Sequence, residues 1–370
     1  MPTIHIKDDL RASVEAASGG RQTVLRTAKG QPTYMNVIPA FNLQDVADAS
    51  ADLGTGIHPA FIVNGAQKSE LFLGSYAGII KNGELLSLPG VDPARSTNFD
   101  SFNSTVRANG AGWHIMTNAE WAALQLWCHK NGFTPRGNTN YGLSSDSTFE
   151  TARRVDGGSP GASSGDGCVL TGSGPASWRH DNSSAGVSDL VGNVWEWQGG
   201  LRLVDGEIQI IPNNDAAFAD LSSGSTAWKA IRLSDGALVA PGTAGTAKFD
   251  SPTATTTGNG GTPILSDTIV NRNGTAGDSS NAAGSMSGVF NSLTTAAGVT
   301  VPSILRALGL FRHADIADSD TIYMRNYGER LPLRGGGWDS GSGAGLRYLG
   351  LFNPRSSVGS NFGARPAFVL

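Results

Sequence analysis

The chain has 370 residues, 50 of them glycine, and its 27 Lys and Arg against 31 Asp and Glu give a net charge of −4. Glycine is roughly twice as frequent as the average of about 7%, and charged residues fall well below the usual share of about 25%. This composition argues against a basic nucleic-acid-binding surface and excludes general disorder, and it favours short strands, turns and few long surface helices.

The first 50 residues are expected to form an N-terminal appendage for attachment or oligomerisation. Asp8 is placed to cap a short helix over residues 9–17 that ends at Gly19-Gly20. Two apolar stretches, 22–28 and 33–38, flank a Lys-Gly pair and predict a β-hairpin. This piece is small, so we do not expect it to fold alone.

The segment from residue 57 to residue 131 predicts the start of the main domain. Apolar stretches at 60–63 and 70–76 around Asn64-Gly65 predict a hairpin. Helices are expected over 98–108 and 118–130, the second opened by a capping box of Thr117 and Glu120. Trp121, Leu124 and Cys128 fall on one face of this second helix, so we expect it to be a core helix.

The remainder alternates loops with short apolar stretches. Residues 132–186 are rich in Gly, Ser and Asn and predict long loops. Residues 201–330 predict an inserted β-rich region, with strands at 201–204, 207–211 and 227–233, a Thr/Gly/Ala/Ser-rich part at 241–300 and a short helix at 302–311. The end, 331–370, sets apolar segments among Gly, Ser and Asn.

Five short motifs occur in a distinctive order. They read TNAEW (117–121), PRGN (135–138), GNVWEW (192–197), RGGGW (334–338) and GARP (363–366). Taken alone, GNVWEW would be a strand with both Trp residues on one face. Together, the motifs resemble the formylglycine-generating-enzyme type of C-type lectin fold, over 57–200 and 331–370. The resemblance implies an α+β domain over 51–370, built of short strands, a few helices and long ordered loops, with the β-rich insertion at 201–330.

The chain departs from that enzyme at its reactive cysteines. The enzyme uses a cysteine pair that lies between its last two motifs, and this chain has no cysteine after Cys168. A soft, deprotonatable sulfur is what that chemistry needs, so we expect no such catalysis here.

A second branch with the same type of fold is a better match. The chain resembles the variable proteins of diversity-generating retroelements, which include phage tropism determinants. In that family a C-terminal stretch, here 331–370, is rewritten by mutagenesis of adenines, chiefly in AAY codons, and the fold presents the changed side chains on an exposed face. Such codons cannot become Lys, Glu, Gln or Met, and 331–370 contains none of these four residues. Glycine-rich strands and turns would also be poor in them.

The resemblance implies a set of variable, ligand-binding positions, each a residue that an AAY codon can reach. Tyr348, Phe352 and Arg347 are expected to be exposed anchors, because aromatic residues and Arg supply much of the energy at interfaces. Without the resemblance, the two aromatic residues would be ordinary core residues. The expected positions are Gly337, Asp339, Ser340, Gly343, Arg347, Tyr348, Gly350, Phe352, Asn353, Ser357, Gly359, Ser360 and Asn361.

No cofactor and no metal site is predicted from the residues. The six histidines lack a ligand spacing, and the carboxylates at 315, 318 and 320 lack the glycine and the final Glu of a calcium loop. The lectin-type fold leaves room for calcium held by backbone carbonyls, which a sequence does not reveal.

The leading hypothesis is therefore a non-catalytic receptor-binding protein whose ligand is a protein or glycan on a cell surface. We expect no nucleic-acid partner and no membrane insertion, and a homo-oligomer is compatible with the sequence. Because residues 1–9 show no signal-peptide pattern, the expected location is a phage tail in the virion, or the cytoplasm with signal-less export. Two alternatives stay open: an oxidoreductase of the formylglycine-generating type that uses other residues, and a structural virion or surface component.

Overall fold

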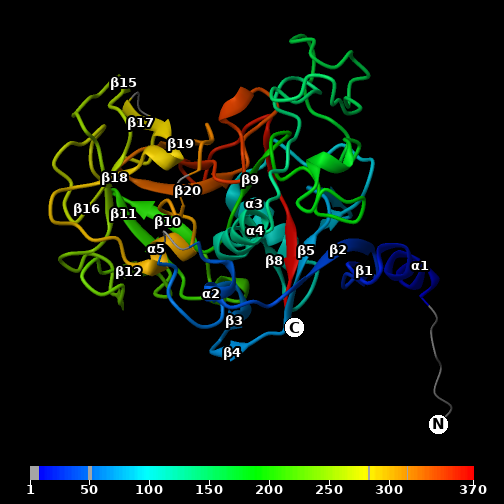
Figure 1. The fold of residues 1–370 in the computed structure, drawn as a ribbon, viewed down its shortest axis with the longest axis horizontal. Coiled ribbons are helices and arrows are strands. Elements are labelled where there is room, and N and C mark those ends of the chain that lie inside the picture. Colours follow the sequence, from blue (N-terminus) through cyan, green and yellow to red (C-terminus); the bar gives the residue numbers. More distant parts are fainter. Residues whose placement is uncertain (1–7, 49–51, 282–283, 315) are drawn as a thin grey trace.

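The fold is α+β, with most of the chain in short strands of curled sheets and only a few helices (Figure 1). The computed structural model describes residues 8–48, 52–281, 284–314 and 316–370. The α+β class expected from the sequence is thus confirmed at this level.

The helices begin where their capping residues predict. Asp8 accepts the backbone N–H of Arg11 at the start of α1, and Thr117 and Glu120 cap α4 reciprocally. Trp121, Leu124 and Cys128 of α4 are buried, as expected for a core helix. The α-helices are α1 (Asp9–Ser18), α2 (Leu43–Val46), α3 (Phe99–Arg107), α4 (Asn118–Lys130) and α5 (Ser303–Ala307). Single 3-10 turns are η1 (Pro59–Phe61), η2 (Ala176–Trp178), η3 (Asp215–Ala217), η4 (Phe290–Ser292) and η5 (Gly341–Gly343).

The predicted N-terminal hairpin exists and belongs to a larger sheet. Its strands β1 (Gln22–Arg26) and β2 (Pro32–Pro39) continue into β5 (Glu70–Gly74), β23 (Pro366–Phe368) and β8 (Trp113–Ile115), in that spatial order. A boundary at residue 50 would therefore cut this five-stranded sheet, because β2 pairs along its length with β5. In Figure 1, α1, β1 and β2 extend to one side of the molecule.

The prediction of a hairpin at Asn64-Gly65 is confirmed for the turn, but the predicted second strand is wrong. Across this turn β3 (Ile62–Val63) pairs with β4 (Ala66–Gln67), whereas residues 70–74 form β5 between β2 and β23. The reason is that an apolar strand is covered on both edges in the larger sheet, which a local pattern does not reveal. A further hairpin joins β6 (Gly78–Lys81) and β7 (Glu84–Ser87).

A second, 14-stranded sheet of described residues contains both the expected insertion and the C-terminal strands. Its main path is β15 (Gly258–Asn259), β17 (Gly284–Val289), β19 (Thr321–Met324), β21 (Leu349–Asn353), β20 (Glu329–Arg334), β10 (Leu201–Val204), β11 (Glu207–Ile210), β14 (Lys248–Asp250), β16 (Ile264–Ser266) and β18 (Thr294–Thr295). Branching from it are β12 (Lys229–Ile231) and β13 (Leu238–Val239) beside β11, and β9 (Trp195–Trp197) and β22 (Phe362–Ala364) beside β20.

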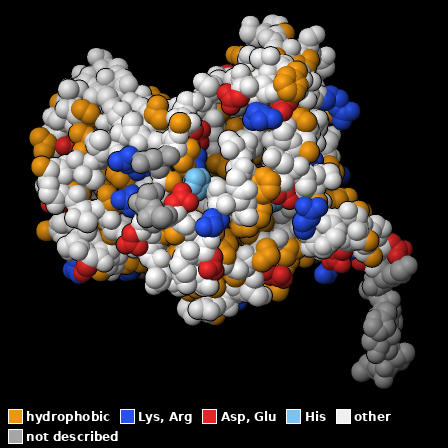
Figure 2. Space-filling model, viewed as in Figure 1, with side chains coloured by type: hydrophobic (Ala, Val, Ile, Leu, Met, Phe, Trp, Pro, Cys, Tyr) orange, Lys and Arg blue, Asp and Glu red, His pale blue; other side chains and the backbone are white. Residues whose placement is uncertain are grey.

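The β-rich character of 201–330 is therefore confirmed, and the low-charge part at 241–300 contributes strands to the sheet. The helix expected over 302–311 is shorter than predicted, because α5 ends at Ala307. Residues 132–186, all of them described, contain no strand, in agreement with the loops expected there. Figure 2 shows the surface hollowed between these loops and the part of the molecule formed by 210–300.

Candidate functional site

Strand β9 lies at the centre of the region where the sequence motifs meet. It pairs with β20 on one edge, Leu333 opposite Trp197, and in parallel with β22 on the other. Between its two Trp residues, Glu196 forms an ion pair with Arg365, at 2.5 Å and 3.0 Å. Both side chains are fully buried, and burial raises the pKa of the Glu196 carboxyl although Arg365 opposes the shift.

The other motifs join this centre through buried polar contacts. Arg334 donates to the side chain of Asn118 on α4, and Trp121 of the same helix donates its indole N–H to the carbonyl of Leu346 at 2.8 Å. Burial lowers the pKa of Arg334 to about 9. We call this assembly the motif unit and define it as residues 117–121, 135–138, 192–197, 333–336 and 362–366.

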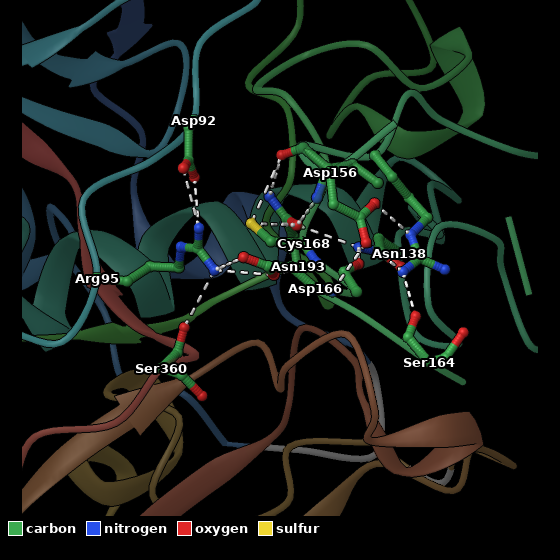
Figure 3. Close-up of polar contacts among 12 residues, drawn as sticks. Asp92, Arg95, Asn138, Asp156, Ser164, Asp166, Cys168, Asn193 and Ser360 are labelled. Atoms are coloured by element: carbon green, nitrogen blue, oxygen red, sulfur yellow. Dashed lines mark hydrogen bonds and ion pairs between the residues drawn. The ribbon is translucent and has the colours of Figure 1, made fainter. Parts of the chain in front are cut away.

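Asn193 connects the loops to the motif unit (Figure 3). It takes a positive φ of 60°, which turns its side chain toward the loop that contains Cys168. Its amide oxygen accepts the amide of Asn138 at 3.1 Å and the backbone N–H of Val169 at 2.9 Å. Since the side chain of Asn193 is fully buried, these bonds fix how residues 138 and 168–169 lie against β9.

Arg95 joins the C-terminal stretch to the loops that contain Asp92 and Asp166. Figure 3 shows its guanidinium between Asp92, Asp166 and the carbonyl of Ser360. The same guanidinium lies 5.6 Å from the ring centre of Trp338, within the range of a cation–π contact. The stretch 337–361 is therefore fixed near both of its ends.

Five of the thirteen positions expected to vary contact Trp195, and three more lie against residues of the same cluster. The ring of Trp195 lies 5.5 Å from that of Tyr348 and 5.4 Å from that of Phe352, and it stacks on Phe362 at 5.5 Å. Its indole N–H donates to Ser340 at 3.1 Å. The five that contact Trp195 are Gly337, Ser340, Tyr348, Phe352 and Asn361, and the three beside them or beside Phe362 are Asp339, Gly350 and Gly359.

The prediction that Tyr348, Phe352 and Arg347 are exposed is wrong, because all three side chains are buried. Tyr348 is 4% exposed, Phe352 8% and Arg347 9%. The two aromatic rings are covered by Trp195, which comes from β9, and Phe352 also by Tyr323 of β19, at 4.3 Å. This covering depends on strands distant in sequence, so the C-terminal stretch alone does not predict it.

The remaining expected positions differ in exposure. Arg347 turns away from Trp195 and forms an ion pair with Asp318 at 2.5 Å. Asp339 and Ser360 are exposed, Ser340, Gly343, Ser357, Gly359 and Asn361 are half-buried, and Gly337, Gly350 and Asn353 are buried. We call residues 337–361 the C-terminal face. Its outer polar groups are those of Asp339, Ser340, Ser360 and Asn361.

Two residues of this region have no signal in the sequence motifs. Tyr323 is half-buried against Phe352, and Arg325 lies 5.7 Å from the ring centre of Phe352. Both come from the end of the β-rich insertion. Only the pairing of β19 with β21 brings them beside the C-terminal face.

Several titratable groups elsewhere are buried, and burial favours their uncharged forms. Burial raises the pKa of the thiols of Cys128 and Cys168, so neither is a ready nucleophile. Burial lowers the pKa of His58 to about 4 and that of His313 to about 3. Among the described residues, no group of three or more His, Cys, Asp or Glu could hold a metal ion. None of the described helices is long and apolar enough to cross a membrane.

No protein-family model and no curated protein sequence matches this chain.

Proposed function

We propose that the chain is a non-catalytic receptor-binding protein whose C-terminal face is diversified by a retroelement and recognises a protein or glycan on a cell surface. The fold we propose for it is the C-type lectin fold of the formylglycine-generating-enzyme type, and the location is a phage tail. The observation on which this rests most is the cluster that eight of the thirteen expected variable positions form at Trp195, five of them in contact with it.

The meeting of all five motifs supports the fold. Residues 117–121, 135–138, 192–197, 334–338 and 363–366 are far apart in sequence and yet touch in one buried unit. A chance set of motifs would have no reason to assemble in this way. Their contacts explain why the chain would keep them while residues between them change.

The contacts of the C-terminal face support its role as a binding surface. Asp339, Ser340 and Asn361 lie at its outer edge, where the side-chain amide of Asn361 donates to Asp339 at 3.4 Å and the hydroxyl of Ser340 accepts the indole N–H of Trp195 at 3.1 Å. Short polar side chains of this kind make adaptable contacts, while rigid rings below them provide support. A larger residue at Ser360 or Asp339 would extend into solvent, because both positions are exposed.

The test is to sequence codons 331–370 in a growing population, together with the neighbouring DNA. We expect a near-copy with adenines at the named codons, and substitutions confined to the thirteen positions while Arg334, Trp338 and Arg365 stay constant. A uniform sequence without a near-copy would contradict the proposal, and the enzyme and structural alternatives would then regain equal weight.

A further inference from the structure

A cavity of about 770 Å³ lies on the other side of the C-terminal stretch from Trp195. Helix α4 forms one wall, and the segments 132–136, 316–320 and 342–347 form the others. Arg347 faces this cavity, whereas its neighbour Tyr348 packs on Trp195. The volume falls within the roughly 300–1,000 Å³ of small-molecule sites.

Two buried side chains that line this cavity have polar atoms without hydrogen-bond partners among the described residues. Gln125 of α4 is 1% exposed, and neither atom of its side-chain amide has a hydrogen bond within the described part of the chain. The Nε of Arg347 is likewise without a partner among the described residues. Because a buried polar group without a partner costs free energy, a ligand that supplies one is favoured.

Carboxyl groups outnumber guanidinium groups around this cavity. Its two guanidiniums are already neutralised, that of Arg347 by Asp318 and that of Arg136 by Glu150. Two further carboxyl groups, those of Asp320 and Asp146, line the cavity, and no ion pair to a cation is seen for either in the described residues. The count is therefore four carboxyl groups against two guanidiniums.

Asp320 shows the effect of this imbalance most clearly. It is 8% exposed, and its carboxyl group accepts the backbone N–H of Arg347 at 2.7 Å. Burial, followed by the charge of Asp318, raises the pKa of Asp320 to about 7, and the charge of Asp146 acts in the same direction. An approaching positive charge would stabilise the ionised form.

The residues that line the cavity disfavour anions, metal ions and apolar ligands. An anion would meet an excess of carboxyl groups. A metal ion lacks a ligand set, since no three His, Cys, Asp or Glu among the described residues are close enough together to hold one. An apolar ligand would leave Gln125 without a partner.

We propose that this cavity binds an organic cation, an alkylammonium or guanidinium group, which is neutralised by Asp320 and Asp146 and hydrogen-bonded by Gln125. The group can belong to a free amine or to a Lys or Arg side chain of a partner protein. The proposal does not depend on diversification of the C-terminal face, so either proposal can fail alone.

The test is calorimetric titration of the full chain at about pH 8, where Asp320 is ionised. The probes are n-butylammonium, ethylguanidinium and the peptide acetyl-Gly-Lys-Gly-amide, with methyl glucoside and sulfate as neutral and anionic probes. We expect the three cations to bind and the other two not to bind. A peptide that binds at least about tenfold more tightly than butylammonium identifies a partner side chain as the source, and equal affinities identify a free amine.

Two variants locate the site. Asp320→Asn keeps an oxygen for the Arg347 N–H and is expected to weaken cation binding at least about tenfold. Gln125→Leu is expected to weaken it about fivefold without lowering the melting temperature, because it removes a buried amide that has no partner. Asp235→Asn, at an exposed ion pair with Arg232, removes the same charge elsewhere and should leave binding unchanged.

Three results would overturn the proposal. They are the absence of binding by all three cations, binding of methyl glucoside or sulfate as tight as that of the cations, and cation affinity unchanged in both Asp320→Asn and Gln125→Leu. Circular dichroism of each variant checks that the fold is intact.

Discussion

The motif unit and the C-terminal face are neighbours in the structure and differ in how their residues are fixed. In the motif unit, buried charged side chains are paired, as Glu196 is with Arg365, or hydrogen-bonded, as Arg334 is to Asn118, and strand β9 is bonded on both edges. In the C-terminal face, rings pack under polar side chains that are exposed or half-buried, such as those of Asp339 and Ser360. We therefore expect the motif unit to tolerate little change and the C-terminal face to tolerate change at its outer positions.

The largest expected effect comes from breaking the buried ion pair of the motif unit. Arg365→Met leaves Glu196 charged or protonated in a fully buried place and should lower the free energy of unfolding by about 3–5 kcal/mol. Urea unfolding measures this. The exposed pair of Arg232 and Asp235 is the control, because Arg232→Met should cost less than about 1 kcal/mol. Equal losses would contradict the comparison.

A second prediction contrasts Glu196, which is paired with Arg365, with Asp320. The carboxyl group of Asp320 is buried behind the C-terminal face and forms no ion pair within the described residues. The folded-state pKa of Asp320, about 7, lies above the unfolded value of about 3.9. The stabilisation from its proton is therefore complete below about pH 4 and is lost as the pH rises through 7, up to about 4 kcal/mol.

Asp320→Asn should remove this contribution, so that the variant loses more unfolding free energy, relative to the parent chain, at about pH 5 than at about pH 8. The buried His58 and His313 act in the opposite direction, because their lowered pKa values destabilise the folded state as the pH falls below about 6.5. They are present in both chains, so the difference between the two pH profiles isolates Asp320. Parallel profiles would show that the assignment is wrong.

A third prediction compares two glycines with positive φ. A methyl group at Gly192, in the motif unit, would overlap the backbone carbonyl of Asn138, whereas at Gly341, in the C-terminal face, it would meet open space. Gly192→Ala should cost about 3 kcal/mol or more, and Gly341→Ala about 1 kcal/mol from backbone strain alone. Thermal unfolding of both variants checks the order, and a reversed order would count against the proposed rigidity of the motif unit.

The smallest effects are expected at the outer edge of the C-terminal face. Asp339→Tyr and Ser360→Tyr place a ring in solvent and should change stability by no more than about 0.5 kcal/mol. Both changes are of the kind that an AAY codon allows. A loss above 2 kcal/mol at either position, measured by urea unfolding, would mean that the face is as constrained as the motif unit.

The features that the sequence predicted well are those with local causes. Asp8 and the pair Thr117 and Glu120 cap helices through bonds that reach three residues along the chain, so their pattern determines where α1 and α4 begin. The turn at Asn64-Gly65 is local in the same sense. The strands that pair with β2 and β9 come from distant parts of the chain, and no local pattern identifies them.

The same distinction applies to the site. The resemblance implied the thirteen positions, eight of which lie in one cluster, but the burial of Tyr348 and Phe352 follows from Trp195 and Tyr323 on other strands. The cavity around Gln125 has no sequence signal at all. A side chain that lacks partners can be recognised only when everything around it is placed.

The position of β23 in the five-stranded sheet has a consequence for faulty copies of the gene. This strand lies between β5 and β8 and is encoded after the whole C-terminal face. A stop codon or frameshift introduced among codons 337–361 therefore also removes β22 and β23, leaving edges of β5, β8 and β9 open and Glu196 without Arg365. We expect such a product to misfold and be degraded. Only variants that are translated in frame to the end of β23 would then fold.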